Sequence, residues 1–277
     1  MAGRVEGKVA FITGAARGQG RAHAVRLAAE GADIIAVDLC AQAETVQYPM
    51  ATPEDLDETV RQVEALGRGI LAVKADVRDL AELCRVVDEG VSRFGRLDIV
   101  VGNAGISAPT AMVDMTEEIW DTMIEVNLTG VWKTVKAALP HLLAGGRGGS
   151  IVLTSSLAAQ QANDNLAHYS AAKAGLIGFM RVLAREMGPH EIRVNSIHPG
   201  FVATPMVMNE SKYRLFRPEL ENPTRADMEE LTRSRHAMPV AAIEAEDVAN
   251  LVLFLCSDEA RYITGTAQII DAGGDLL

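Results

Sequence analysis

Short apolar runs alternate with helical segments along almost the whole chain, and this alternation limits the fold more than any other feature. The runs are rich in Val, Ile and Ala, which is typical of strands that helices cover on both faces of a parallel sheet. The expected strands are 9–13, 33–37, 70–73, 97–101, 150–153, 193–197 and 267–270, and the expected helices are 21–30, 53–66, 80–94, 116–143, 169–187 and 245–255.

Right-handed crossovers join strands and helices of this kind into one doubly wound sheet. We therefore expect an α/β protein with a single-domain Rossmann fold and a parallel sheet over residues 1–277. No internal repeat or linker divides the chain. Because aromatic residues make up only 4% of the chain against 48% hydrophobic residues, the core must be aliphatic.

Charge and the Cys and His residues argue against several classes of function. A net charge of −11, without a local Lys/Arg cluster, disfavours nucleic acid and anionic membranes as partners. Cys40, Cys84 and Cys256 lie far apart and the six His residues lack metal-ligand spacing, so we expect no disulfide framework and no metal site. The absence of a signal-like stretch or a membrane-length apolar run predicts a cytoplasmic protein.

A glycine-rich turn follows the first expected strand and leads into the first expected helix. It contains Gly14, Gly18 and Gly20, a spacing that differs from the common G-x-G-x-x-G of dinucleotide-binding folds. Glycines let the backbone turn tightly and approach a pyrophosphate, and the helix N-terminus offers N–H donors and partial positive charge. The turn therefore predicts a site for a dinucleotide.

Two charged residues bear on which dinucleotide would bind. Asp38 ends the second expected strand, about 20 residues after the turn, where a carboxylate can bind both ribose hydroxyls and repel a 2′-phosphate. Arg17, within the turn, favours the opposite choice because it could attract that phosphate. Asp38 should lie directly beside the ribose, so we expect NAD rather than NADP.

Ser156, Tyr169 and Lys173 form the candidate catalytic group. Ser156 follows the end of an expected strand, and Tyr169 and Lys173 are four positions apart, so they share one face of a helix. Oxidation of an alcohol requires removal of the hydroxyl proton while hydride leaves carbon. Tyr169 can serve as the base if a nearby ammonium and the oxidised nicotinamide lower its pKa, while Ser156 holds the substrate oxygen.

Taken together and in order, these motifs resemble those of the short-chain dehydrogenase/reductase family over nearly the whole chain. The resemblance also includes Asn103-Ala104-Gly105, Asn127 and Pro199-Gly200, and it implies that Asn127 holds a water that relays protons from Lys173. It further implies a homotetramer. Gln19 departs from the family, which often has an aliphatic residue there. The implied cofactor-binding residues are Gly14, Arg17, Gly18, Gln19, Gly20, Asp38, Leu39, Asp76, Val77, Asn103, Ala104, Gly105, Tyr169, Lys173, Pro199, Gly200, Val202 and Thr204.

Two long segments narrow the resemblance. Residues 40–57 exceed the usual connection after a second strand, and residues 204–238 are polar, Met-bearing and interrupted by three prolines. The segment 40–57 and, within the second segment, residues 213–218 and 221–224 resemble the mycofactocin-coupled subfamily, which includes carveol dehydrogenases. Because 40–57 directly follows Asp38, we expect it to fold as a cofactor lid over the adenine–ribose half of NAD and to hold NAD tightly, and we expect 204–238 to form a substrate lid. The resemblance implies a bulky apolar secondary alcohol or ketone as substrate and mycofactocin as an external electron carrier.

Two alternative functions remain open from the sequence. One is an NADPH-dependent ketoreductase of biosynthesis, which Asp38 disfavours. The other is a protein that binds NAD as a sensor without turnover, which the intact set of Asn127, Ser156, Tyr169 and Lys173 disfavours. The identity of the bound cofactor and the activity toward alcohols distinguish these two alternatives from the NAD-dependent dehydrogenase.

Overall fold

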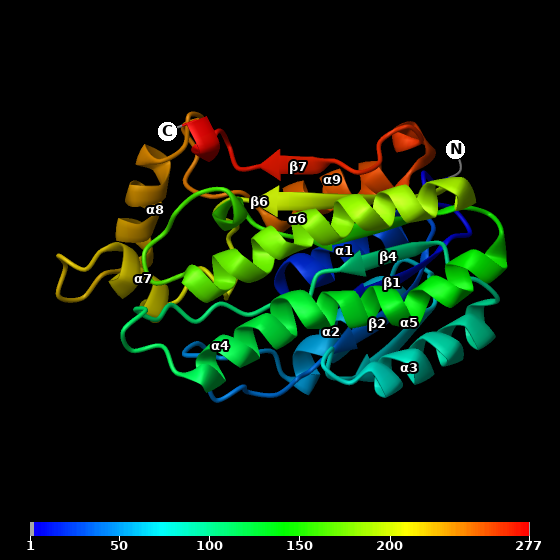
Figure 1. The fold of residues 1–277 in the computed structure, drawn as a ribbon, viewed down its shortest axis with the longest axis horizontal. Coiled ribbons are helices and arrows are strands. Elements are labelled where there is room, and N and C mark those ends of the chain that lie inside the picture. The colour runs from blue at the N-terminus through cyan, green and yellow to red at the C-terminus, as the bar shows by residue number, and fades with distance from the viewer. Residues whose placement is uncertain (1–2, 277) are drawn as a thin grey trace.

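A computed structural model describes residues 3–276 as one α/β unit around a seven-stranded sheet (Figure 1). The strand order is β3-β2-β1-β4-β5-β6-β7, and every neighbouring pair is parallel. This arrangement confirms the predicted doubly wound fold, with the order reversing between β1 and β4. The strands are β1 (Val9–Thr13), β2 (Asp33–Asp38), β3 (Ile70–Lys74), β4 (Ile99–Gly102), β5 (Gly149–Thr154), β6 (Ile192–Pro199) and β7 (Ala267–Ile270).

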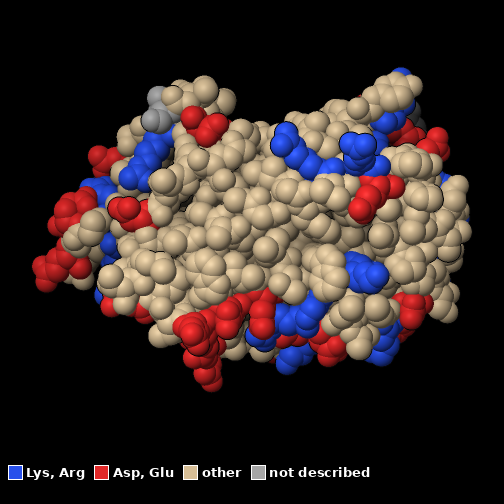
Figure 2. Space-filling model, in the orientation of Figure 1, with Lys and Arg blue, Asp and Glu red and all other residues tan. Residues whose placement is uncertain are grey.

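Helices cover both faces of the sheet, and α4, α5 and α6 lie toward the viewer in Figure 1. On that face, charged side chains are concentrated near the edges of the molecule and are sparse over its centre (Figure 2). The helices are α1 (Gly18–Ala29), α2 (Pro53–Glu64), α3 (Leu80–Phe94), α4 (Glu117–Ile124), α5 (Gly130–Gly145), α6 (Ala167–Met187), α7 (Glu210–Phe216), α8 (Arg225–Ser234) and α9 (Ala245–Cys256). No helix within residues 3–276 is long and apolar enough to cross a bilayer.

Two apolar cores hold the helices against the sheet. Ala10 and Ile12 of β1 belong to the core that includes α1, α2 and α9, whereas Phe11 belongs to the core that includes α3, α5 and α6. Successive side chains of a strand point to opposite faces, so one buried run supplies both cores. This is why the strand segments lack the apolar–polar alternation of a half-exposed sheet.

The segment predicted as one helix over 116–143 is interrupted. A π-helical turn, η1 (Glu125–Thr129), separates α4 from α5, and α5 continues to Gly145. Such turns are frequent at functional sites because the extra residue changes the direction in which a side chain points. Here the turn carries Asn127.

Helices α7 and α8 occupy the segment 204–238, for which the sequence predicted no helix. Asn209 caps α7, and Thr224 with Asp227 forms a capping box at the start of α8. In Figure 1 both helices lie at the end of the molecule toward which the strand arrows point. They therefore lie beyond the carboxyl ends of the strands, where open α/β sheets bind their ligands.

Candidate active site

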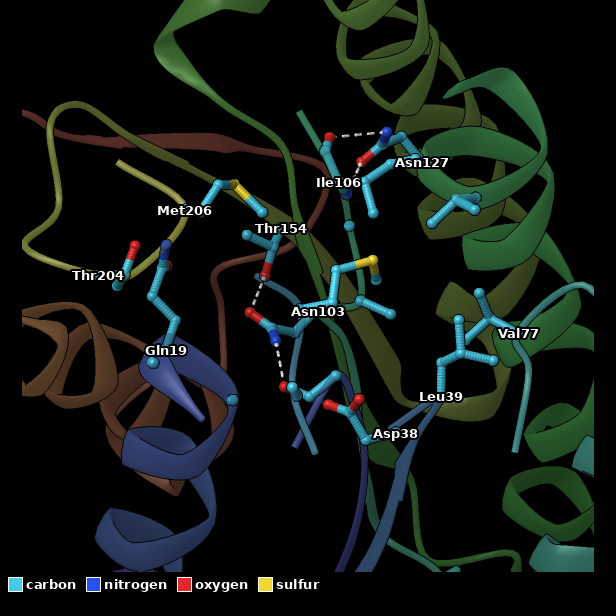
Figure 3. A pocket seen from close by; sticks show the side chains of 18 of the residues that line it. Gln19, Asp38, Leu39, Val77, Asn103, Ile106, Asn127, Thr154, Thr204 and Met206 are labelled. Carbon is cyan, nitrogen blue, oxygen red and sulfur yellow. Dashed lines mark hydrogen bonds between the residues drawn. The ribbon is translucent and has the colours of Figure 1, made fainter. Parts of the chain in front are cut away.

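One cavity at the carboxyl ends of the strands collects all the residues that the sequence singled out as catalytic or cofactor-binding. They come from the turn after β1, the end of β2, the segments after β3, β4, β5 and β6, and the η1 turn and α6. Figure 3 shows Asp38, Asn103 and Thr154 around this space, with Gln19 and Thr204 on one side and Val77 and Leu39 on the other.

The glycine turn forms a cradle that side chains would block. A Cβ at Gly20 would lie 1.9 Å from the carbonyl oxygen of Gly14, and Gly14 and Gly18 have φ angles of +67° and +55°. Asn103 braces the turn, because its Nδ2 donates to the carbonyl oxygen of Thr13 at 3.0 Å. Helix α1 begins here without a side-chain cap, so its first N–H groups are available to a pyrophosphate.

Asp38 is held in place by the backbone at the end of β2. Its Oδ2 accepts from the N–H of Ala16 at 3.0 Å, and its Oδ1 accepts from the N–H of Cys40 at 3.1 Å. The Arg17 guanidinium donates instead to the carbonyl oxygen of Pro49. The arginine that could favour a 2′-phosphate therefore holds the segment 40–52, and both it and the Asp38 carboxylate border the cavity.

The end of the cavity opposite Gln19 and Thr204 (Figure 3) is suited to an adenine. Val77 and Leu39 offer apolar walls, and Arg78, which the sequence did not single out, lines the cavity beside them. Burial tends to raise the pKa of Asp76, but hydrogen bonds from Arg78 outweigh burial and leave that pKa below its ordinary value. The Nη2 of Arg78 donates to the Asp76 Oδ2 at 2.7 Å, which fixes both side chains.

Ser156, Tyr169 and Lys173 converge as predicted. Ser156 follows β5, and Tyr169 lies in the first turn of α6 with Lys173 one turn later. The Lys173 Nζ donates to the carbonyl oxygen of Thr154 at 2.7 Å and lies 5.8 Å from the centre of the Tyr169 ring. The Oγ of Ser155 donates to the carbonyl oxygen of Lys173 at 2.8 Å, so the strand end also holds the helix.

The expected fall in the pKa of Tyr169 is not produced by the protein's own groups. Burial raises the pKa of Tyr169, and a hydrogen bond with Ser156 offsets this only in part. Burial also lowers the pKa of Lys173 to about 7, which weakens the ammonium on which the expectation relied. The sequence shows that these residues are neighbours but not how far water is excluded from them. The predicted fall in the pKa of Tyr169 also relies on the positive nicotinamide, which the protein's own groups do not supply.

The π-helical turn aims Asn127 at the loop after β4. Its Nδ2 donates to the carbonyl oxygens of Ile106 and Met123 at 3.1 and 3.2 Å, and its Oδ1 accepts from the N–H of Ile106 at 3.2 Å. A Cβ at Gly105 would lie 2.7 Å from this Oδ1 and 3.4 Å from the Lys173 Nζ. Glycine at this position therefore keeps open the space between Asn127 and Lys173.

His198 supports the catalytic strand ends, although the sequence did not assign it a role in the site. Its Nδ1 lies 3.1 Å from the carbonyl oxygen of Ser156, and its Nε2 lies 2.9 Å from the Oγ of Ser196. Burial lowers the pKa of His198, which favours a neutral ring that can donate at one nitrogen and accept at the other. Its position directly before Pro199 was the only sequence signal.

The segment 40–52 reaches farther than the sequence predicted. It was expected to cover the adenine–ribose half of a dinucleotide, yet Val46 and Tyr48 also pack in an apolar cluster with Ile106, Tyr169 and Met206. Burial raises the pKa of Tyr48 to about 12, and a hydrogen bond with the backbone of Ser107 offsets part of that rise. The stretch therefore borders the candidate catalytic tyrosine as well as Asp38.

The second long segment meets the first directly. The Oγ of Ser211 in α7 donates to the Oε1 of Gln47 at 3.1 Å, and the buried Lys212 donates its Nζ to the Oγ of Ser107 at 2.7 Å. Met206 lines the cavity from this segment. The first turn of α7 thus contacts both the 40–52 segment and the loop after β4.

Comparison with known proteins gives matches over almost the full chain. The family model described as enoyl-(acyl carrier protein) reductase matches residues 14–274. A Mycolicibacterium smegmatis protein named as a short-chain type dehydrogenase/reductase is 59% identical over 100% of both chains. The (−)-trans-carveol dehydrogenase of Rhodococcus erythropolis is 55% identical over 99% of both chains. The crystal structure of carveol dehydrogenase from Mycobacterium avium in complex with NAD has a TM-score of 0.98 and 55% identity, covering 99% of this chain and 100% of that one.

Proposed function

Because this chain belongs to the short-chain dehydrogenase/reductase family, we propose that it is an NAD-dependent alcohol dehydrogenase that moves a hydride between a secondary alcohol or ketone and nicotinamide. The observation that carries the proposal is the convergence of Ser156, Tyr169 and Lys173 on the cavity that the glycine cradle also borders. A sensor that binds NAD without turnover would not need these three side chains in one place.

NAD fits the residues of the cavity, and when bound it supplies the carbon that accepts or donates hydride. The cradle of Gly14, Gly18 and Gly20 suits the pyrophosphate, and the Asp38 carboxylate suits a ribose that carries free hydroxyls. The carveol dehydrogenase with a TM-score of 0.98 was solved with NAD. The alternative of an NADPH-dependent ketoreductase is not favoured, since Arg17 is engaged with Pro49.

The proton moves through the protein's own side chains. In oxidation, the substrate hydroxyl donates its proton to the Tyr169 oxygen while Ser156 donates a hydrogen bond to the same substrate oxygen. Lys173 is held by the Thr154 carbonyl, and its ammonium and the positive charge of the oxidised nicotinamide together stabilise the phenolate. Asn127 holds the water that carries the proton onward from Lys173. Reduction of a ketone reverses each transfer.

The substrate we propose is bulky and apolar, such as a cyclic terpenoid alcohol like carveol. Ile106, Val126 and Met206 line the cavity and pack in one cluster with Tyr169, and none of these can pair with a charged or sugar-like substrate. Methionine side chains adapt their shape, which suits an irregular hydrocarbon. The 55% identity to a (−)-trans-carveol dehydrogenase supports the same class of substrate.

We further propose that 40–57 is a cofactor lid and 204–238 a substrate lid, and that the closed lids hold NAD so tightly that it barely exchanges. The supporting contacts are the bond between Arg17 and Pro49, the bond between Ser211 and Gln47, and the apolar cluster around Tyr48. An enzyme that keeps its NADH needs an external electron acceptor, and the resemblance suggests mycofactocin. Mass spectrometry of the nucleotide released from purified protein tests the retention.

A panel of cyclic and linear secondary alcohols tests the activity, with added NAD in one series and an artificial redox dye in the other. We expect oxidation of cyclic apolar alcohols and faster turnover with the dye. A protein that purifies empty and turns over freely with added NAD would contradict tight retention but not the dehydrogenase activity. Absence of oxidation or reduction in both series would contradict the dehydrogenase itself.

We also propose a cytoplasmic homotetramer. Trp120 of α4 and Trp132 of α5 are 37% and 42% exposed, and Val182 of α6 is 60% exposed. Large apolar side chains exposed together on one face are typical of subunit interfaces. They lie on the helices of the face whose charges are concentrated near the edges in Figure 2. Light scattering of the purified protein measures the assembly.

A further inference from the structure

Gln19 leaves a polar group without a partner inside the cavity. It is the second residue of α1, and its side chain borders the cavity. Its Oε1 is buried and has no hydrogen-bond partner within the described residues. In Figure 3 the side chain extends toward Thr204, and no hydrogen bond joins it to the other side chains drawn. A buried polar atom without a partner is costly, and at a ligand site the ligand can supply the partner.

The position of the amide limits which part of NAD could meet it. A Cβ at Gly18 would lie 3.3 Å from the Cγ2 of Thr204, so the glycine turn and the segment after β6 are in contact here. The adenine end is on the far side of the cavity at Val77 and Leu39 (Figure 3). Gln19 therefore lies between the pyrophosphate cradle and the reacting end of the cofactor.

The chemistry of the Gln19 Oε1 further limits which group of NAD can be its partner. An amide oxygen accepts hydrogen bonds, and a pyrophosphate has no hydrogen to donate. The hydroxyls of the nicotinamide ribose lie nearest Tyr169 and Lys173 in the proposed function. The remaining donor on this half of NAD is the N–H₂ of the nicotinamide carboxamide.

From these contacts we propose that the Gln19 side chain accepts a hydrogen bond from the carboxamide N–H₂ of the nicotinamide and so fixes the orientation of the ring. The inference rests on the proposed use of NAD and adds a residue that determines how the ring is held. An aliphatic residue, which the family often has at this position, cannot make this bond. Gln19 is thus a binding and positioning residue rather than a participant in proton transfer.

A pair of cofactors isolates this bond. Reduced 3-acetylpyridine adenine dinucleotide has an acetyl group in place of the carboxamide and therefore lacks the N–H₂. The protein is loaded with this analogue or with NADH by prolonged incubation in excess. Gel filtration at intervals and the absorbance of the bound reduced ring then give the two release rates. The ratio of the analogue rate to the NADH rate is the readout, and it does not depend on turnover.

Two substitutions at Gln19 separate loss of the hydrogen-bond acceptor from a change of charge, because only one of them should change this ratio. Gln19→Leu removes the acceptor, so we expect the ratio to fall by about 5-fold to 10-fold, the effect of one buried hydrogen bond. Gln19→Glu keeps an acceptor of the same shape. Its repulsion of the pyrophosphate affects both dinucleotides equally and cancels, so we expect a ratio within about 2-fold of wild type. Gln19→Met replaces the Leu variant if the latter does not fold.

The control is Gln62→Leu, because Gln62 bonds Glu58 on α2 at 2.7 Å and does not line the cavity. Its ratio should equal that of wild type. A wild-type ratio in Gln19→Leu, or a ratio in Gln19→Glu as low as in Gln19→Leu, overturns the inference while leaving the proposed function intact. If wild type loses both dinucleotides during gel filtration, tight retention is contradicted but the dehydrogenase is not, and the ratio of the two dissociation constants from fluorescence titration then replaces the ratio of release rates. A wild-type protein that binds neither dinucleotide in that titration overturns the proposed function and the inference with it.

Discussion

Truncation of Tyr48 should release the cofactor. Tyr48 is 5% exposed and packs with Ile106, Tyr169 and Met206, so it ties the 40–52 segment to the centre of the site. Replacing a buried aromatic side chain by Ala costs about 3 kcal/mol or more in a well-packed site. If the segment must leave this cluster before NADH can escape, Tyr48→Ala lowers the cost of opening by that amount. Since about 1.4 kcal/mol is a factor of ten, release should become about 10²-fold faster.

The assay measures the NADH release rate from the loss of bound-NADH fluorescence after mixing with a large excess of non-fluorescent NAD. Tyr262→Ala is the matched control, because Tyr262 is 89% exposed and its loss should leave the release rate unchanged. Tyr48→Phe keeps the packing and loses only the hydroxyl that bonds the Ser107 backbone, so its effect should be much smaller. Release from Tyr48→Ala at the wild-type rate would refute the view that this segment retains the cofactor. Deleting part of 42–52 should speed release at least as much.

Three further predictions test the site. Tyr169→Phe should lower turnover at least ~10²-fold while bound nucleotide per protomer stays near wild type, and near-normal turnover would remove Tyr169 as the base. Asp38→Ala should weaken the preference for NAD over NADP in kcat/KM, whereas an unmodified protein that prefers NADP would show that Arg17 decides. Burial lowers the pKa of Lys212 to about 8, below its ordinary value of 10.5, so unfolding takes up a proton between those values and the free energy of unfolding rises with pH across that window. Lys212→Met should flatten this rise in denaturant titrations at pH 8 and 10, and an unchanged slope would show that Lys212 is solvated.

The sequence predicts the sheet well because its signal is local and strong. A run such as 9–13 is apolar at nearly every position, and only a strand covered on both faces buries all of it. The residues of the cavity follow, since a parallel sheet brings its strand ends to one edge. Asp38, Asn103, Ser156 and Pro199 each stand at or after such an end, so the topology alone gathers them.

Features that depend on tertiary contacts were missed. Helix α7 has 7 residues, too few to be stable alone, and its Lys212 and Ser211 find partners only in distant segments. The π-helical turn at Asn127 continues a helical pattern, so periodicity does not reveal it. The raised pKa of Tyr169 depends on how completely its neighbours exclude water, which no spacing of residues encodes.

The loop after β4 links the segment 40–52 to helix α7. Ser107 accepts a hydrogen bond from Lys212 of α7 and bonds Tyr48 through its backbone, while Ser211 of α7 bonds Gln47. Lifting 40–52 away from the cavity therefore breaks a contact with α7, and moving α7 breaks one with 40–52. A bound alcohol that holds α7 closed therefore also holds 40–52 closed and slows cofactor release. By thermodynamic linkage, the cofactor must then increase the affinity for the alcohol by the same factor by which the alcohol increases the affinity for the cofactor. Slower NADH release in the presence of a non-oxidisable alcohol analogue would show this coupling, and it should weaken in Tyr48→Ala, which loses the contact of Tyr48 with Ser107 but keeps the bond between Ser211 and Gln47.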